Sequence, residues 1–311
     1  MDELRFDGKV AIVTGAGRGI GAQYARLLAA RGAQVVVNDL GIGVTGESTE
    51  DAPAERLVGE IVASGGTAIA SDHNVIDEAD GLIECAMDTF GRIDIVVNNA
   101  GITGGGPFGR LTPAQFDLLF DTHFTGTVNV SRAAWPHLLS AGQGRLVSTA
   151  SPAVFGGQFI AHYASAKAAT LSFTKVLAQE GARKNVNVNA VAPSASTRMT
   201  SFVPGALSDY VDQFFPPADV AAFVAWLVHE STTVTGEAFV VGGGVARRIV
   251  MAVSRGQRVS ERSPEAWAAV GDKLLAPDGL DFPSDLVDDM RFHAERLGGE
   301  ALTTFERIAG S

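Results

Sequence analysis

Cysteine is almost absent from this chain, since Cys85 is the only one among 311 residues. A single thiol cannot build an internal disulfide framework, and it is typical of proteins that fold in a reducing compartment. Apolar runs of membrane-spanning length are also missing, because segments such as Val10–Val13 and Val35–Val37 are only strand-length. The first residues, Met1–Arg5, lack the basic and then apolar pattern of a signal peptide. We therefore expect a soluble, cytoplasmic protein.

Positive charge is scarce as well. The chain carries 24 Lys and Arg residues against 35 Asp and Glu residues, which gives a formal net charge of −11. An acidic chain is poorly suited to nucleic acid or to anionic membrane surfaces, so neither is predicted as a partner. No set of metal ligands is predicted either. Aromatic residues make up only 7%, whereas glycine is abundant and 46% of residues are hydrophobic, which is typical of tightly packed helices and strands.

Short apolar segments alternate with longer helical patterns from the N-terminus to Gly242-Gly243-Gly244. This alternation predicts an α/β fold: a Rossmann-type, doubly wound parallel sheet of about seven strands with helices on both faces. Strands are expected at Lys9–Thr14, Gln34–Asn38, Thr67–Ser71, Ile93–Asn98, Gly144–Thr149, Asn185–Val191 and Ala238–Val241. Helices are expected at Ile20–Arg31, Ala54–Ser64, Asp77–Phe90, Pro113–Leu139, Tyr163–Arg183 and Pro217–His229.

Two regions depart from this alternation. Residues 199–216 form an irregular stretch that contains several aromatic residues, and we interpret it as a flap that covers a substrate. After Gly244 the sequence becomes more charged, with helical patterns at Pro264–Leu275 and Pro283–Arg296. We therefore predict one domain over residues 1–244 and a C-terminal helical extension over residues 245–311.

A glycine-rich turn, Thr14–Gly21, follows the first predicted strand and opens the first predicted helix. Glycines allow a tight turn and a close approach of the backbone to a diphosphate, and the start of a helix offers free N–H groups to it. The most familiar dinucleotide motif is not met, because Ile20 occupies the position of its last glycine. The turn still predicts a dinucleotide site, which makes residues 1–244 a dinucleotide-binding catalytic domain. Its predicted contacts are Gly15, Arg18, Gly19, Ile20 and Gly21.

Asp39 ends the second predicted strand, about eighteen residues after Gly21. A carboxylate at this place can accept both hydroxyl groups of the adenosine ribose, and it would repel a 2′-phosphate. The predicted cofactor is therefore NAD. Arg18 leaves NADP open, since its guanidinium group could receive a 2′-phosphate.

Tyr163 and Lys167 lie four residues apart in a segment that is predicted as helix. Residues at this spacing share one helix face, so the phenol and the ammonium group project together. A nearby fixed cation favours the phenolate and lowers the pKa of a tyrosine toward the working range. The pair is a candidate acid–base centre.

These motifs together resemble the short-chain dehydrogenase/reductase family. Thr14–Gly21 resembles the TGxxxGxG turn, Asn98–Gly101 resembles NNAG, and Tyr163 with Lys167 resembles YxxxK. The resemblance covers residues 6–244. A closer similarity is to the (3R)-hydroxyacyl-CoA dehydrogenase unit of multifunctional enzymes type 2, also called 17β-hydroxysteroid dehydrogenase type 4. The segments that carry it are Arg5–Gly8, Val37–Gly41, Ser131–Trp135 and Ala192–Thr200, and Ser263–Ala266 extends it weakly beyond residue 244.

The resemblance implies a role for each matching residue. Tyr163 would be the acid and base at the substrate oxygen, and Lys167 would lower the pKa of Tyr163 and hold the nicotinamide ribose. Further cofactor contacts implied in the same way are Asn98 and Ala100, Asn74 and Val75 near the adenine, and Pro193, Ala195 and Thr197 at the nicotinamide end.

The resemblance also implies an activity, namely NAD-dependent interconversion of a secondary alcohol and a ketone in lipid or steroid metabolism. The substrate would be bulky and hydrophobic, either a 3-hydroxyacyl-CoA or a hydroxysteroid, and the protein would form a homodimer or homotetramer. An NADPH-linked ketoreductase and a non-catalytic dinucleotide-binding protein are the alternatives.

Two positions depart from the family pattern. Ala150 stands where the family has the serine that holds the substrate oxygen, thirteen residues before the tyrosine. Ser151 is the preferred replacement, Thr149 is the second choice, and a site without this hydroxyl is the third. His123 stands where most of the family has an asparagine that anchors a proton-relay water. It is either a member of that relay or a histidine packed in the core.

Overall fold

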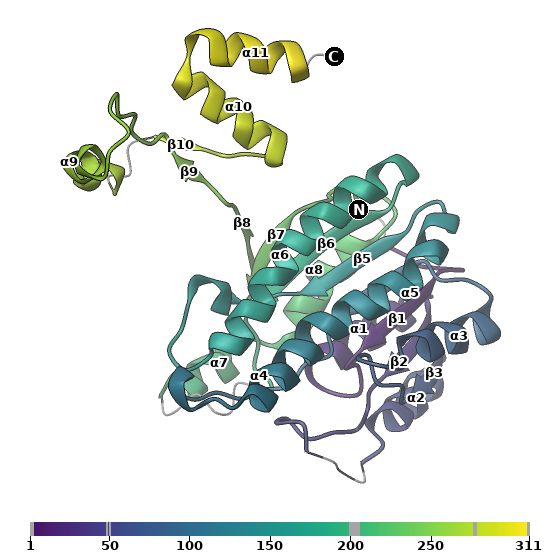
Figure 1. The fold of residues 1–311 in the computed structure, drawn as a ribbon. Helices are drawn as coiled ribbons and strands as arrows, with labels where there is room; N and C mark the ends of the chain where they lie inside the picture. The colour runs from purple at the N-terminus through teal and green to yellow at the C-terminus, as the bar shows by residue number, and fades with distance from the viewer. Residues whose placement is uncertain (1–2, 48, 50, 199–205, 276–278, 310–311) are drawn as a thin grey trace. The chain divides into compact units, whose positions relative to one another are not determined.

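Eight strands form the main sheet of the computed structural model, which describes residues 3–47, 49, 51–198, 206–275 and 279–309. The strands run side by side in the order β3-β2-β1-β4-β5-β6-β7-β8 (Figure 1). Their bounds are β1 Val10–Thr14, β2 Gln34–Asn38, β3 Thr67–Ser71, β4 Ile95–Asn98, β5 Arg145–Thr149, β6 Asn187–Pro193, β7 Ala238–Gly242 and β8 Val245–Ile249. The pairings from β3 through β7 are parallel, which confirms the predicted α/β class.

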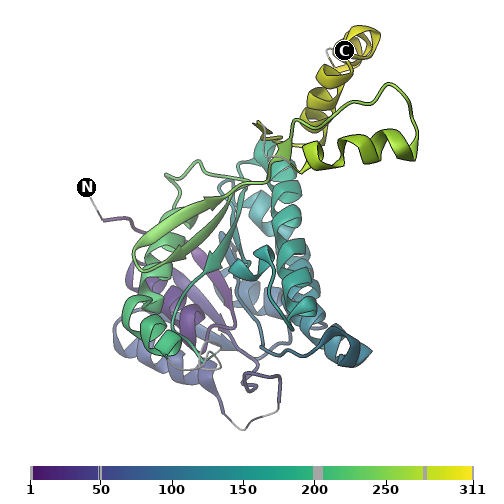
Figure 2. The ribbon, with the colours of Figure 1, turned by 90° about the vertical axis from the view of Figure 1, so that its left-hand side faces the viewer.

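Helices cover both faces of this sheet, as Figures 1 and 2 show. Side chains alternate along each strand, so Ala11 and Val13 of β1 join one apolar cluster while Ile12 joins the other. The first cluster is completed by α1, α2 and α8, and the second by α3, α5 and α6. The helix bounds are α1 Gly19–Ala30, α2 Pro53–Ala63, α3 Ala79–Phe90, α4 Pro113–Phe120, α5 Gly126–Ser140, α6 Ala161–Gly181, α7 Ala206–Phe214 and α8 Pro217–Val228.

Three elements differ from the sequence prediction. The helix expected over Pro113–Leu139 is interrupted by a π-helical turn at Asp121–Thr125 between α4 and α5. α7 occupies part of the stretch that was expected to be irregular, and residues 199–205 of the predicted flap lie outside the described residues. β8 was not predicted, and with it the sheet has eight strands rather than about seven. The two-residue turn Gly243-Gly244, with φ of +59° and +71°, suits a tight hairpin after β7.

The described residues contain no single helix long and apolar enough to cross a membrane. Only the bent pair Ser208–Phe214 and Pro217–Val228 reaches that length and composition together.

The chain divides into two compact units, Met1–Arg248 and Ile249–Ser311. The second unit holds the strand pair β9 Val253–Ser254 and β10 Leu280–Asp281, and the helices α9 Pro264–Leu274, α10 Leu286–Leu297 and α11 Gly299–Ala309. Ser263 and Asp285 cap α9 and α10 with their side chains, at helices that the sequence predicted. Among its described residues only Ala294 is buried. The assignment of catalysis to residues 1–244 stays a prediction.

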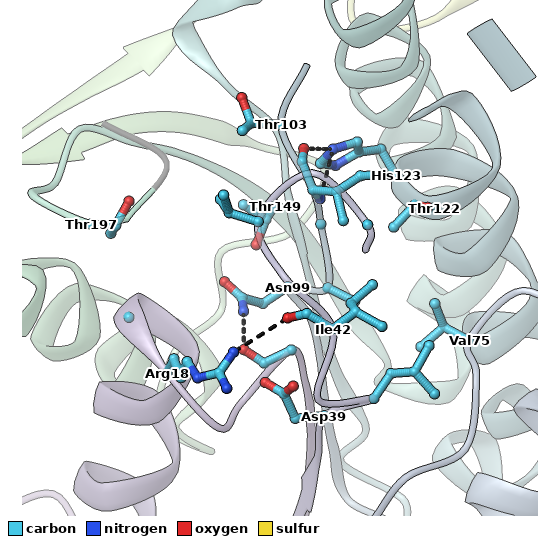
Figure 3. A pocket seen from close by; sticks show the side chains of 18 of the residues that line it. Arg18, Asp39, Ile42, Val75, Asn99, Thr103, Thr122, His123, Thr149 and Thr197 are labelled. Carbon is cyan, nitrogen blue, oxygen red and sulfur yellow. Dashed lines mark hydrogen bonds between the residues drawn. The ribbon is translucent and has the colours of Figure 1, made fainter. Parts of the chain in front are cut away.

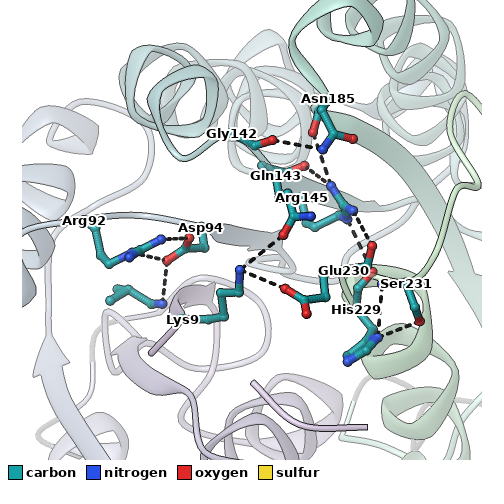
Figure 4. A network of polar contacts seen from close by, with 12 residues as sticks. Lys9, Arg92, Asp94, Gly142, Gln143, Arg145, Asn185, His229, Glu230 and Ser231 are labelled. Carbon is teal, nitrogen blue, oxygen red and sulfur yellow. Dashed lines mark hydrogen bonds and ion pairs between the residues drawn. The ribbon is translucent and has the colours of Figure 1, made fainter. Parts of the chain in front are cut away.

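A polar network closes the end of the sheet where the parallel strands begin (Figure 4). The buried guanidinium group of Arg145, at the start of β5, donates to the carbonyl oxygens of four residues, listed with their distances: Gly144 (2.9 Å), Glu230 (3.1 Å), Asn185 (3.3 Å) and His229 (3.4 Å). Nearby, the buried carboxylate of Asp94 accepts from the backbone N–H of Val10 at 2.9 Å and from Arg92. These contacts fix the starts of the strands whose other ends form the site.

Candidate active site

A cavity of about 760 Å³ opens at the carboxyl ends of the parallel strands. The chain crosses from β3 to β4 over β1 and β2, so the connections after β1 and β4 leave the sheet in opposite directions. Ligands of open α/β sheets bind at such a reversal. Of the predicted site residues, those that line the cavity are Gly15, Arg18, Gly19, Ile20, Asp39, Asn74, Val75, Ala100, His123, Ser151, Tyr163, Lys167, Pro193, Ala195 and Thr197.

The glycine turn forms the floor of one end of the cavity. Gly15 has φ of +60°, and a Cβ atom there would lie 2.8 Å from the Cα of Ala100. A Cβ atom on Gly21 would lie 2.3 Å from the carbonyl oxygen of Gly15, so Gly21 supports the turn from behind and does not line the cavity. The first turn of α1 has no side-chain cap and no acidic residue. Its N–H groups are therefore available to an anion such as a diphosphate.

Asn98 and Asn99, at the end of β4, point in opposite directions. Asn98 is buried, donates to the Ser131 hydroxyl at 2.9 Å and does not line the cavity, so its contact with the cofactor stays a prediction. Successive residues of a strand point to opposite faces, which turns Asn99 toward the cavity instead. Its side-chain amide donates to the carbonyl oxygens of Thr14 and Gly15, both at 3.0 Å, and so ties β4 to the glycine turn (Figure 3).

Asp39 lies at the same end of the cavity and binds two backbone N–H groups. Its two carboxylate oxygens accept from Gly17 and from Gly41, each at 2.9 Å. Arg18 lies beside it, donates to the carbonyl oxygen of Ile42 at 3.3 Å and pairs with Asp51. Figure 3 shows Arg18 and Asp39 toward one end of the cavity and Thr149 and His123 toward the other.

The loop after β2 also lines the cavity, which the sequence analysis missed. Ile42, Gly43, Val44 and Gly46 contribute to the wall, and the carbonyl oxygen of Val44 accepts the N–H of Thr103 at 2.7 Å. The available signal was two apolar residues set among glycines in a loop that is otherwise polar.

Tyr163, Ser151 and Lys167 meet at the other end of the cavity. The first turn of α6 presents Tyr163, and Lys167, one turn later, is buried with its ammonium nitrogen 5.9 Å from the centre of the Tyr163 ring. That ammonium group donates to the carbonyl oxygen of Thr149. Ser151 leaves β5 in an extended conformation, and its side chain lines the cavity with Tyr163 and lowers the pKa of that residue. Thr149 Oγ1 is buried and has no partner among the residues described.

Burial governs the protonation of this end. It raises the pKa of Tyr163, and the hydrogen bond with Ser151 only partly offsets that rise. Burial also lowers the pKa of Lys167 to about 7. The expected lowering of the Tyr163 pKa by Lys167 is therefore not seen in the protein alone. The Lys167 ammonium group donates to the carbonyl oxygen of Thr149 and not to the Tyr163 hydroxyl. Removal from water is therefore the largest effect on the pKa of Tyr163 and on that of Lys167.

His123 lies in the π-helical turn and is buried against Tyr163, with ring centres 4.9 Å apart at 86°. Its Nε2 atom lies 2.7 Å from the carbonyl oxygen of Ile102, and its Nδ1 atom has no partner in the described part of the chain. Burial and the charge of Lys167 hold the pKa of His123 well below its usual value. His123 is therefore neutral at pH 7, with one ring nitrogen left for a ligand or a water molecule.

Comparison with known proteins gives this geometry a family. Residues 9–204 match the family described as short chain dehydrogenase. The chain belongs to that family. As a short-chain dehydrogenase it is an oxidoreductase enzyme, and it is similar to the peroxisomal multifunctional enzyme type 2 of Mus musculus, with 40% identity over 86% of this chain. The peroxisomal multifunctional enzyme A of Dictyostelium discoideum is 39% identical over 90% of this chain.

This short-chain dehydrogenase spans only part of those relatives, namely 62% of the Dictyostelium protein and 37% of the mouse protein. Among solved structures it is similar to a 7α-hydroxysteroid dehydrogenase complexed with NADH and 7-oxo glycochenodeoxycholic acid. That likeness has a TM-score of 0.70 and 30% identity, and it covers 78% of this chain and 98% of the other. The family binds nicotinamide dinucleotides and acts on small molecules.

Proposed function

We propose that this dehydrogenase uses NAD to interconvert a secondary alcohol and a ketone on a bulky hydrophobic substrate. The observation that carries the proposal is that one cavity contains both a site suited to a dinucleotide and a site suited to proton transfer. One end has the glycine turn, the uncapped start of α1 and the carboxylate of Asp39. The other brings together Tyr163, Ser151 and Lys167, with the Lys167 nitrogen 5.9 Å from the centre of the Tyr163 ring.

The residues at the first end fit a nicotinamide dinucleotide. The N–H groups at the start of α1 would hold the diphosphate, and Asp39 would accept the hydroxyl groups of the adenosine ribose. Asn74 and Val75 would border the adenine, while Pro193, Ala195 and Thr197 would border the nicotinamide. When bound in its oxidised form, the cofactor would accept the hydride and bring one positive charge into the cavity.

The residues at the second end would handle the proton. The Tyr163 hydroxyl would exchange a proton with the substrate oxygen, and the Ser151 hydroxyl would donate a hydrogen bond to that oxygen. Because burial raises the Tyr163 pKa, the phenol is a ready donor for ketone reduction. Oxidation of an alcohol requires the phenolate, which added positive charge in the cavity favours.

The substrate is proposed from the relatives, because two of them are named as peroxisomal multifunctional enzymes and one solved neighbour holds a steroid-type ligand. We propose a 3-hydroxyacyl-CoA or a hydroxysteroid, in a homodimer or homotetramer whose state light scattering would test. Turnover of a medium-chain (3R)-hydroxyacyl-CoA and of a 17β-hydroxysteroid, measured side by side with NAD, would choose the substrate. No turnover of either, with NAD bound, would contradict both assignments.

Two substitutions test the chemistry. Tyr163→Phe should abolish turnover while NADH binding is kept, and retained turnover would refute the proposal. Ser151→Ala should lower kcat by about 10²–10³, the usual cost of one lost donor to a developing oxyanion. Thr149→Val is the matched control, since Thr149 is the other hydroxyl at this end, and it should cost far less. An equal loss in Thr149→Val would reassign the hydroxyl to Thr149.

A further inference from the structure

The adenosine end of the cavity holds a cluster of charged groups that the catalytic chemistry does not use. Arg18 and Arg198 line the cavity together with the carboxylate of Asp39. The loop after β2 adds Glu47 and Asp51, whose charges also act on Arg198. A dinucleotide with a phosphate on its adenosine ribose would place that phosphate among these groups, because Asp39 marks the position of the ribose hydroxyls.

Arg18 and Arg198 are the two cations of this cluster, and Arg18 is the one that pairs with Asp51. Its guanidinium could bind phosphate oxygens with two parallel hydrogen bonds. In the structure, however, both of its terminal nitrogens are engaged. One donates to the carbonyl oxygen of Ile42 at 3.3 Å, and the other pairs with the carboxylate of Asp51.

Asp51 is itself fixed in place. Its second carboxylate oxygen accepts from Arg56, in the first turn of α2, at 2.9 Å. Hydrogen bonds from Arg56 and from Arg18 lower the pKa of Asp51, so it is ionised at neutral pH. The side chain of Arg18 is 18% exposed and that of Asp51 is 36% exposed; Arg18 lines the cavity, and Asp51 binds it from outside the lining.

We propose that Asp51 is a specificity-determining residue that excludes NADP by holding and neutralising Arg18. This inference rests on the proposed binding of a nicotinamide dinucleotide. Asp39 repels a 2′-phosphate directly, whereas Asp51 acts by keeping the competing cation away from it. Two carboxylates from different segments, the end of β2 and the entry to α2, then favour NAD together.

The test is the ratio of the dissociation constants for NADH and NADPH, measured by fluorescence titration of the full chain. Asp51→Asn keeps the size of the side chain and removes its charge, so residue 51 no longer neutralises Arg18 and holds it only by a weaker, uncharged acceptor. We expect the ratio to move toward NADPH by about ten-fold, as expected for one unit charge removed within several ångströms of a phosphate in a partly hydrated site. Adding Arg18→Gln to this variant should remove the gain.

Glu60→Gln is the matched control, because Glu60 forms a similar ion pair with Arg26 on the exposed side of α2, away from the cavity lining. It should leave the ratio unchanged. If Asp51→Asn weakens both dinucleotides equally, or its gain survives Arg18→Gln, Asp51 only shapes the loop and the inference is wrong. Failure of the unmutated protein to bind either dinucleotide would instead contradict the proposed function.

Discussion

Lys167 carries a cost in stability that can be measured directly. Its side chain is buried, and burial lowers its pKa from 10.5 to about 7. A lysine whose folded-state pKa lies below its unfolded value destabilises the fold most at low pH. The penalty is full below about pH 7 and disappears as the pH rises toward the unfolded value. The stability of the protein should therefore rise across this range.

The magnitude follows from the shift. About 3.5 pKa units correspond to roughly 4–5 kcal/mol at pH 7. Lys167→Met keeps an unbranched side chain of similar length and removes the charge. It also leaves the carbonyl oxygen of Thr149 without its ammonium donor, which costs about 1–3 kcal/mol. The net expectation is a variant about 2–3 kcal/mol more stable than the unmutated protein at pH 7, and catalytically inactive.

The pH dependence separates this explanation from general packing effects. Between pH 7 and pH 9 the unmutated protein should gain about 2 kcal/mol that Lys167→Met does not gain, so the advantage of the variant shrinks toward zero. Other titrating groups, Cys85 among them, are common to both proteins and cancel in the difference. His123, whose pKa Lys167 also lowers, is held neutral at both pH values mainly by burial. Lys175→Met, the same substitution eight residues later in α6, is the control for adding an apolar side chain to this helix.

The assay is urea unfolding at both pH values without dinucleotide, because a ligand that binds the folded state would shift the apparent stability. A Lys167→Met variant that is less stable than the unmutated protein by the same margin at pH 7 and pH 9 would refute the reasoning. That result would mean that the ammonium group carries no desolvation penalty at this position.

Two further predictions concern the scaffold. Arg145→Met should lower the free energy of unfolding by about 3 kcal/mol, since it leaves buried carbonyl oxygens without a donor. Activity per folded molecule should be unchanged, because the network lies at the other end of β5 from the cavity. A loss of stability below about 0.5 kcal/mol would contradict this role of Arg145. Gly21→Ala should weaken NADH binding and lower the melting temperature, because its Cβ would overlap the carbonyl oxygen of Gly15. Gly59 is exposed in the middle of α2, and a Cβ atom added there would meet no atom within 4 Å. Gly59→Ala should therefore raise the free energy of unfolding by about 0.5–1 kcal/mol. Equal melting temperatures for the two glycine variants would argue against this account of the turn.

Elements with a clear period were predictable from sequence. β2, with three buried valines, and α2, with its apolar face, lie within one residue of their predicted bounds. The π-helical turn at Asp121–Thr125 was not predictable, because one extra residue in a turn hardly disturbs the apolar pattern along a long helix. That turn matters for function, since it holds His123 against Tyr163.

Positions at the ends of strands were the least predictable part of the site. A shift of one residue turns a side chain to the opposite face of a sheet. At the end of β4 the resemblance named Asn98, which is buried, whereas the asparagine that lines the cavity is Asn99. Ser151 and Thr149, on either side of Ala150, both line the cavity. Ser151 lowers the pKa of Tyr163, while Thr149 Oγ1 has no partner among the described residues.

The two ends of the cavity treat their polar groups differently. At the adenosine end, Asp39 and Arg18 are satisfied by backbone groups and by Asp51, so this end is ordered before any ligand arrives. At the reacting end, Thr149 Oγ1 and His123 Nδ1 are buried without a partner in the described residues, and burial lowers the pKa of Lys167 to about 7. Buried polar atoms without partners cost free energy, and a fold tolerates them where a ligand or water can supply the missing hydrogen bonds. The free energy gained when a ligand binds the ordered end can therefore offset the free-energy cost of the buried, unpartnered polar atoms at the reacting end.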